Sequence, residues 1–204
     1  MGPREIRRAF SRLVDATTAA GGTVAERLRP GLSPEEITSE LANVGVSPHP
    51  HLIGWFSAHN GTDLDGNRFS PHQNLGSSWQ AVGLHEMLRQ RQRAIEILVT
   101  CGGDPSYFPE SWFPISRWSG IPLLCLDTED EQGPLFEYEF PEGDSFPPNT
   151  TIPAYSNIID FVDAIEFALE NEYMIWEGVE DGGFYGPLPW PKELTERYPN
   201  VVLW

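Results

Sequence analysis

The chain has 204 residues, with 30 Asp and Glu against 13 Lys and Arg, a net charge of -17 and a pI near 4.5. This charge argues against a nucleic-acid or anionic-membrane partner, because binding to phosphate-rich surfaces depends on Lys and Arg. Hydrophobic residues make up 40% of the chain and aromatic residues 12%, which indicates a folded core rather than a disordered acidic chain.

The first half of the chain has the pattern of a helical region. Apolar residues recur at helical spacing in four segments, and residues that tolerate a left-handed backbone follow three of them. Ser33, Pro34 and Glu36 form a capping box, and Ser47 with Pro48 is interpreted as a second start of the same kind. The predicted helices cover residues 6–20, 33–44, 47–58 and 78–100.

The second half favours strands and then one more helix. Residues 121–126 are almost entirely apolar and predict a buried strand. In residues 135–140 the aromatic and acidic side chains alternate, which predicts a half-exposed strand with Phe136, Tyr138 and Phe140 on one face. Ser156 is the expected cap of a helix that follows, and the tail from residue 178 is expected to be irregular and to pack through Phe184, Tyr185 and Trp190.

The negative charge is concentrated near the C-terminus. Residues 124–204 hold eighteen Asp and Glu against two Lys and Arg. A field of one sign raises the rate of association with an oppositely charged partner by roughly 10–1000-fold. The predicted turn and strand display much of this charge, and Tyr138 is the candidate aromatic anchor, with Tyr185 as the alternative. The predicted partner-binding residues are Glu129, Asp130, Glu131, Glu137, Tyr138, Glu139, Glu142 and Asp144.

No catalytic or metal-binding motif is complete in this sequence. His85 and Glu86 begin like a zinc-peptidase helix, but Arg89 stands where the second histidine belongs. The run from Asp63 to Asn67 resembles part of a calcium loop, but it lacks the ligands that such a loop needs at its ends. We therefore expect no enzyme activity, no cofactor and no metal. A small hydrolase or metal enzyme that uses His59, Asp63 and Asp65 is the least favoured alternative.

The order of short motifs resembles the SUKH superfamily, which contains the yeast cell-wall-synthesis regulator and many bacterial immunity proteins. The resemblance covers residues 28–172, so residues 1–27 are expected to be an N-terminal arm, helical in part, and residues 173–204 an acidic tail packed on or near the domain. It implies an α+β fold in which helices flank a mixed, mainly antiparallel sheet. The motifs are Leu32-Ser33-Pro34-Glu35-Glu36-Ile37, Gly45 with Pro48, Trp55-Phe56 with His59-Asn60-Gly61, Trp112-Phe113-Pro114-Ile115, Gly120, Leu124-Cys125-Leu126-Asp127, Gly133 and Ser156.

The resemblance also implies binding rather than catalysis. The leading hypothesis is an immunity protein that neutralises a cognate toxin, such as a nuclease, by direct binding through an acidic face. The alternative is a regulatory or scaffolding protein of the same fold, with a cell-wall or signalling role. The expected partner is a basic toxin domain rather than nucleic acid or membrane. Two cysteines and the lack of a signal-peptide pattern favour the cytoplasm, and the oligomeric state stays open.

Overall fold

The computed structural model describes residues 2–63, 70–118, 122–140, 152–178, 183–186 and 189–200. Its helices are α1 (Pro3–Ala19), α2 (Pro34–Asn43), α3 (Pro50–Ala58), α4 (Leu84–Thr100), α5 (Ile158–Glu170) and α6 (Lys192–Arg197). Its strands are β1 (Trp79–Ala81), β2 (Trp112–Trp118), β3 (Leu123–Asp127), β4 (Leu135–Tyr138), β5 (Ile175–Trp176) and β6 (Phe184–Tyr185). In these described ranges no helix is long and apolar enough to span a bilayer.

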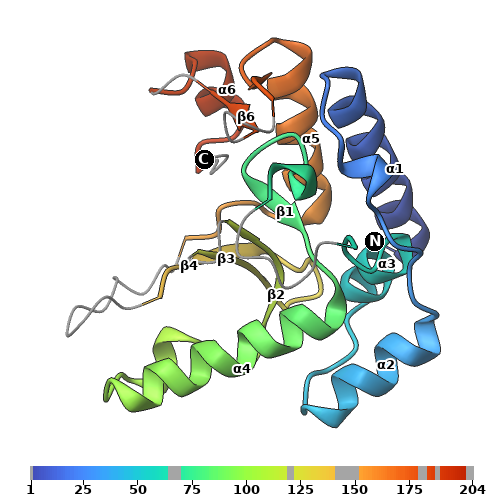
Figure 1. The fold of residues 1–204 in the computed structure, drawn as a ribbon. Coiled ribbons are helices and arrows are strands. Elements are labelled where there is room, and N and C mark those ends of the chain that lie inside the picture. The colour runs from blue at the N-terminus through green and yellow to red at the C-terminus, as the bar shows by residue number, and fades with distance from the viewer. Residues whose placement is uncertain are drawn as a thin grey trace.

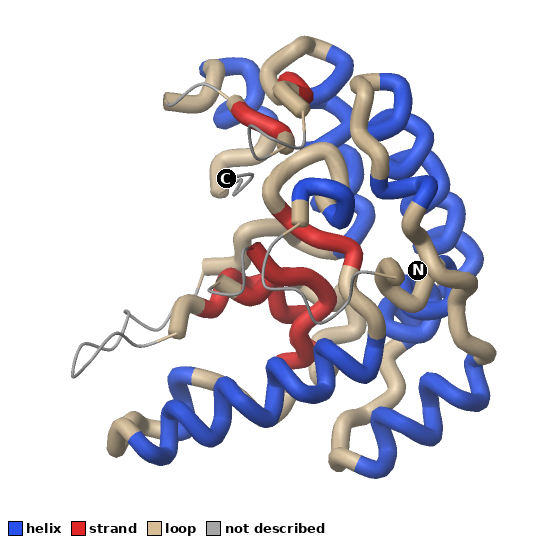
Figure 2. The backbone as a smooth tube through the Cα atoms, viewed as in Figure 1, coloured by secondary structure: helices blue, strands red, loops and turns tan. Residues whose placement is uncertain are grey.

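The strands form a four-stranded sheet in the order β1-β2-β3-β4 and a separate two-stranded ribbon of β5 and β6 (Figure 2). Helices and sheet together confirm the expected α+β class. Every strand pair within the described residues is antiparallel, so the parallel component of a mixed sheet is not seen there.

Both faces of the larger sheet are covered. Along β3, Leu124 and Leu126 contribute to the main hydrophobic core, whereas Leu123 and Cys125 contribute to a second, smaller cluster with residues of α4. This alternation is the normal period of a strand. Figure 1 shows α4 running across one side of the sheet while α1, α3 and α5 gather on the other.

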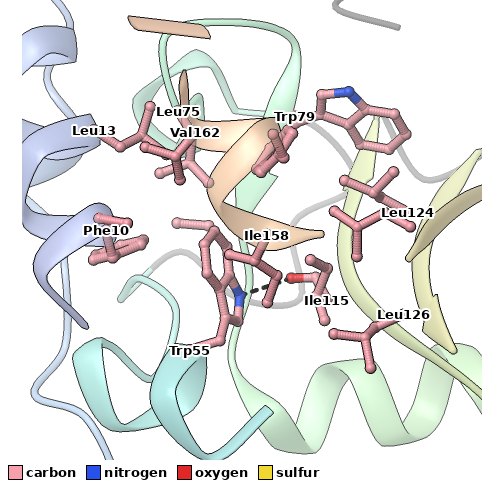
Figure 3. Packing of buried hydrophobic residues seen from close by; sticks show 14 of the residues in the cluster. Phe10, Leu13, Trp55, Leu75, Trp79, Ile115, Leu124, Leu126, Ile158 and Val162 are labelled. Atoms are coloured by element: carbon pink, nitrogen blue, oxygen red, sulfur yellow. Dashed lines mark hydrogen bonds between the residues drawn. The ribbon is translucent and has the colours of Figure 1, made fainter. Parts of the chain in front are cut away.

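Trp55 lies at the centre of the main core and joins two of the motifs that the sequence pointed out. Its indole Nε1 donates a hydrogen bond to the carbonyl oxygen of Ile115 at 3.1 Å (Figure 3). The ring of Phe10 meets it edge-on with centroids 5.1 Å apart, and Phe56 meets Phe113 edge-on at 6.1 Å. Trp55, Phe56, Trp112 and Ile115 are all buried.

The N-terminal helix is part of this core. Ile6, Phe10 and Leu13 of α1 are buried, and the helix packs against α3 and α5. On its outer side Arg12 bridges Asp163 and Glu166 of α5, with N···O distances of 2.8 and 3.0 Å. Segment 1–27 therefore helps to build the hydrophobic centre of the molecule, which the sequence pattern did not indicate.

The His59-Asn60-Gly61 motif stops one helix and caps another. Gly61 has a φ of +70°, a left-handed conformation that costs glycine little. The side-chain oxygen of Asn60 accepts a hydrogen bond from the backbone N–H of Leu84 at 3.1 Å. Asn60 thus satisfies an otherwise unpaired donor in the first turn of α4. The sequence pattern predicted only the terminating role.

The N-caps of two helices differ from the sequence prediction, by two residues in α3 and by one residue in α5. Helix α2 begins as predicted, with the reciprocal Ser33–Glu36 capping box. Helix α3 begins at Pro50 rather than near Ser47, because the His49 imidazole provides the cap by accepting from the N–H of His51. In α5 the cap is Asn157, whose side-chain oxygen accepts two backbone N–H groups, and not Ser156.

The prediction of one helix over residues 78–100 was wrong at its start. Residues 79–81 form β1, whose register places Trp79 opposite Trp118 and Ala81 opposite Ser116. Gly83 then precedes α4 in an extended conformation. The pairing of β1 with β2 joins segments more than thirty residues apart, and this tertiary contact outweighs the local helical pattern.

The aromatic face of β4 does not offer Tyr138 as a surface anchor. The alternation itself is correct, but Phe136 and Tyr138 pack into the smaller cluster beside α4. Tyr138 is only 4% exposed, and its ring lies 4.8 Å from that of Phe108. It is therefore a core residue and is not displayed at the surface as an anchor.

Parts of the C-terminal segment also enter the core. Met174, Phe184 and Leu194 are buried, and Trp190 is partly buried against the main cluster. Tyr185, the alternative anchor, is 50% exposed. The segment consequently has both a packed side and a displayed side.

Candidate functional site

The most compact set of predicted contact residues lies on the turn that joins β3 to β4. This acidic turn, defined as residues 127–133, carries Glu129, Asp130 and Glu131 in succession, and all three are exposed. Because they are neighbours on a short connection, their charges act on one small area of surface. The turn is therefore the candidate binding site.

Local hydrogen bonds fix the shape of the acidic turn. The carboxylate of Asp127 accepts the N–H of Glu129 at 3.0 Å, and that of Asp130 accepts the N–H of Gln132 at 2.8 Å. Thr128 bonds to the Ser111 carbonyl oxygen through both its N–H and its hydroxyl. Asp127 and Asp130 thus hold the backbone, and they leave Glu129 and Glu131 to project their charge.

The inner side of the turn rests on two histidines at the start of α3. Gly133 has a φ of +61° and closes the turn. A Cβ atom at this position would lie 2.6 Å from Nδ1 of His51 and 3.0 Å from Cε1 of His49. Only glycine fits here without displacing an imidazole, so these contacts fix the turn relative to the body of the protein.

The acidic turn has no neutralising partner in the described part of the chain. No ion pair there involves Glu129, Asp130 or Glu131, whereas Arg12, Arg27 and Arg117 are each paired with other acidic residues. Unpaired exposed carboxylates keep their full field toward solvent, screened only by salt. The turn is thus suited to attract a positively charged surface.

The remaining predicted contact residues do not join the turn. Glu137 is half-buried and Glu139 is exposed, and both lie at the opposite end of β4. Glu137 pairs with Leu124, three residues before the turn begins at Asp127, which is about 10 Å along the strand, so these carboxylates form a separate area. Glu142 and Asp144 lie outside the described residues.

Of the residues of the hydrolase alternative, the structure places His59 in the core and Asp63 at the surface. His59 is fully buried, and its ring stacks on Phe10 with centroids 4.2 Å apart. Asp63 is exposed and pairs with Arg27, and Asp65 lies outside the described residues. Within those residues no three His, Cys, Asp or Glu side chains are placed to share a metal ion.

Three buried histidines lie on or beside α3, two at its start beneath the acidic turn and His59 at its end. Burial lowers the pKa of His51 from 6.5 to about 4, helped by the neighbouring His49, and lowers the pKa of His59 to about 3. It also lowers the pKa of His49, although the nearby backbone of Glu131 and Asp130 opposes this effect. Nδ1 of His49 and of His59 each accepts a backbone N–H, which requires an unprotonated nitrogen.

We expect the protein to lose stability as pH falls below about 6.5. The unfolded chain takes up protons near that pH, whereas folded His51 and His59 resist protonation down to about 4 and 3. At pH 5 this difference amounts to roughly 2 kcal/mol for each histidine. Urea unfolding between pH 7 and pH 5 measures it.

Two variants identify the source of that pH dependence. His51→Phe fills the same buried site with an apolar ring. We expect the unfolding free energy of this variant to fall less steeply as pH is lowered, by an amount that corresponds to about one proton fewer taken up on unfolding. His85 is exposed on α4, so His85→Gln is the matched control and should leave the slope unchanged. An unchanged slope in His51→Phe would contradict the assignment.

No protein-family model and no curated protein matches this chain. The likeness to the SUKH superfamily therefore depends on the order and spacing of the short motifs in the sequence.

Proposed function

We propose that this chain is a non-enzymatic, SUKH-like immunity protein that neutralises a basic toxin domain by binding it through the acidic turn. The observation that carries the proposal is the set of three adjacent exposed carboxylates, Glu129, Asp130 and Glu131, on a turn held by its own hydrogen bonds. The motif order and the excess of acidic residues after residue 124 support it.

Binding of this kind follows from charge and preorganisation. A complementary field speeds the encounter and rejects partners of the wrong sign. Because the turn is already ordered, little conformational entropy is lost when it is bound. A nuclease holds phosphates with Lys and Arg, so an acidic protein bound over those residues would exclude the nucleic acid. In the regulatory alternative, the C-terminal tail or the N-terminal arm recruits a cellular partner instead.

Affinity capture from native lysate at low and at moderate salt tests the proposal. Three baits are compared: the wild type, a turn-neutral variant (Glu129→Gln, Asp130→Asn and Glu131→Gln), and a control variant (Glu26→Gln, Glu96→Gln and Glu193→Gln). The substitutions keep side-chain shape, and the amide oxygen that Asp130→Asn introduces would still accept the turn hydrogen bond. All six positions are exposed, so both variants lose three surface charges.

The proposal predicts that the wild type and the control variant each retain a basic toxin in stoichiometric amount at low salt. Moderate salt releases this toxin, and the turn-neutral bait does not retain it. Retention of a cell-wall or signalling protein instead would favour the regulatory alternative. A partner held equally by all three baits at both salt concentrations would rule out the acidic turn as the binding site.

A further inference from the structure

The C-terminal ends of α1 and α5 lie side by side next to the β5–β6 ribbon (Figure 1). Between them is a hollow of about 700 Å³, which we call the docking hollow. This volume is within the usual range for ligand sites, roughly 300–1,000 Å³. Its lining is largely apolar and includes Ala16, Ala19, Ala20, Leu169, Met174 and Trp176.

Two large apolar side chains are exposed on the β5–β6 ribbon, and one of them, Ile175, lines the hollow. Ile175 and Tyr185 are directly opposite each other in the β5–β6 pair, with 56% and 50% of their surfaces exposed. Directly opposed residues project from the same face of a ribbon. The other pair, Trp176 and Phe184, packs toward Gly21 and Gly22 at the end of α1. The ribbon is thus anchored on one face and open on the other.

The hollow is also electrically negative. Glu170 and Glu172 line it, and both are exposed. The ends of α1 and α5 add to this field, because the last carbonyl groups of a helix carry a partial negative charge. Neither helix has a basic residue in its last turn to offset that charge.

Glu172 occupies a position that a glycine would fill with less strain. Its φ is +56°, and among the described residues it is the one non-glycine with a positive φ. A left-handed conformation strains an ordinary L-residue, because its Cβ atom comes too close to the following carbonyl oxygen. Helices usually end with glycine at such a place. A carboxylate is present at the rim despite this strain.

We propose that the docking hollow binds a segment of a partner protein that presents an apolar side chain flanked by Arg or Lys. The apolar lining takes the side chain, and the two carboxylates with the helix ends take the basic groups. Ile175 and Tyr185 are exposed apolar side chains that the partner would bury on binding, and buried side chains of this kind contribute much of the binding energy at protein interfaces.

This surface is distinct from the acidic turn. His51, beneath the turn, is within electrostatic reach of Glu5 in the first turn of α1. The hollow lies at the other end of that helix, where its nearest lining residue, Ala16, is eleven residues beyond Glu5, about 16 Å along the axis. The inference therefore does not depend on the function proposed for the turn.

Fluorescence titration with three labelled peptides of equal length tests the proposal. The first flanks a Trp-Leu pair with Arg, the second flanks the same pair with Glu, and the third keeps the Arg residues but replaces the pair with Ser. The first is expected to bind wild-type protein at least about tenfold more tightly than the other two. No binding, or equal binding of the second or third peptide, would overturn the proposal.

Variants locate the bound peptide. Ile175→Asp and the pair Glu170→Gln with Glu172→Gln should each weaken the first peptide by about tenfold. Val99 on α4 is 69% exposed, so Val99→Asp is the matched control for Ile175→Asp, and both it and the turn-neutral variant should bind as wild type. Binding lost only in the turn-neutral variant would assign the peptide to the acidic turn and overturn the proposal. Concentration-dependent dimerisation abolished by Ile175→Asp would instead identify a second copy as the occupant.

Glu172→Gly separates the function of the carboxylate from any role in folding. Glycine relieves the left-handed strain, so we expect the Tm to rise by about 1–3 °C, after allowing for its greater unfolded-state entropy. The same variant should bind the first peptide more weakly. A fall in Tm together with unchanged peptide binding would contradict the role assigned to this side chain.

Discussion

Trp55→Ala is expected to lower the free energy of unfolding by about 3–5 kcal/mol. The indole is fully buried, contacts rings from α1 and α5, and donates the hydrogen bond that ties α3 to the Ile115 carbonyl on β2. Alanine would leave a large cavity where these elements meet. Urea denaturation of the wild type and the variant measures the change.

Trp55→Phe separates packing from hydrogen bonding. It keeps most of the ring but leaves the Ile115 carbonyl without the indole donor, at an expected cost of about 1–3 kcal/mol. Tyr185→Ala is the control, because that side chain is half exposed and its loss should change the stability little. A denaturation midpoint for Trp55→Ala equal to that of the wild type would contradict the central place given to this residue.

Arg117→Met is expected to destabilise the protein by about 3–5 kcal/mol. Arg117 is 3% exposed and forms an ion pair with Glu86, which is 7% exposed, at 3.2 Å. Its Nε also donates to the side-chain oxygen of Gln80 at 3.1 Å. Removing the guanidinium leaves a buried carboxylate with less compensation, although Glu86 keeps hydrogen bonds from Arg89 and Gln90.

The double variant Arg117→Met with Glu86→Leu tests whether the cost comes from that stranded charge. If it does, the double variant recovers most of the stability, because both charges have been replaced by apolar groups. Unfolding free energies of the wild type, the two single variants and the double variant complete the cycle. Strictly additive losses would show that the two side chains act independently.

Local chemistry explains which helices the sequence predicted correctly. The Ser33–Glu36 capping box and Gly45 specify the start and end of α2 without help from the rest of the chain. Residues 79–81 were misassigned because their strand identity comes from pairing with residues 116–118. Such pairing is a tertiary property that a local window does not contain.

The distinction between local signals and tertiary contacts also applies to the surface. A run of Asp, Glu and Gly between two strands predicts an exposed turn, and Glu129 to Glu131 are exposed there. To predict that Tyr138 is buried, one has to know that α4 covers that face of the sheet, which is a tertiary contact. The docking hollow joins the ends of α1 and α5, about 150 residues apart in sequence, and no local pattern indicates their proximity.

The measurement that tests the central claim most directly is the affinity of the purified captured partner for the wild type and the turn-neutral variant, each at several salt concentrations. If the acidic turn is the binding site, the wild type binds at least about tenfold more tightly at low salt, and the difference shrinks as salt screens the three carboxylates. Equal affinities and equal salt slopes for the two proteins would contradict the account.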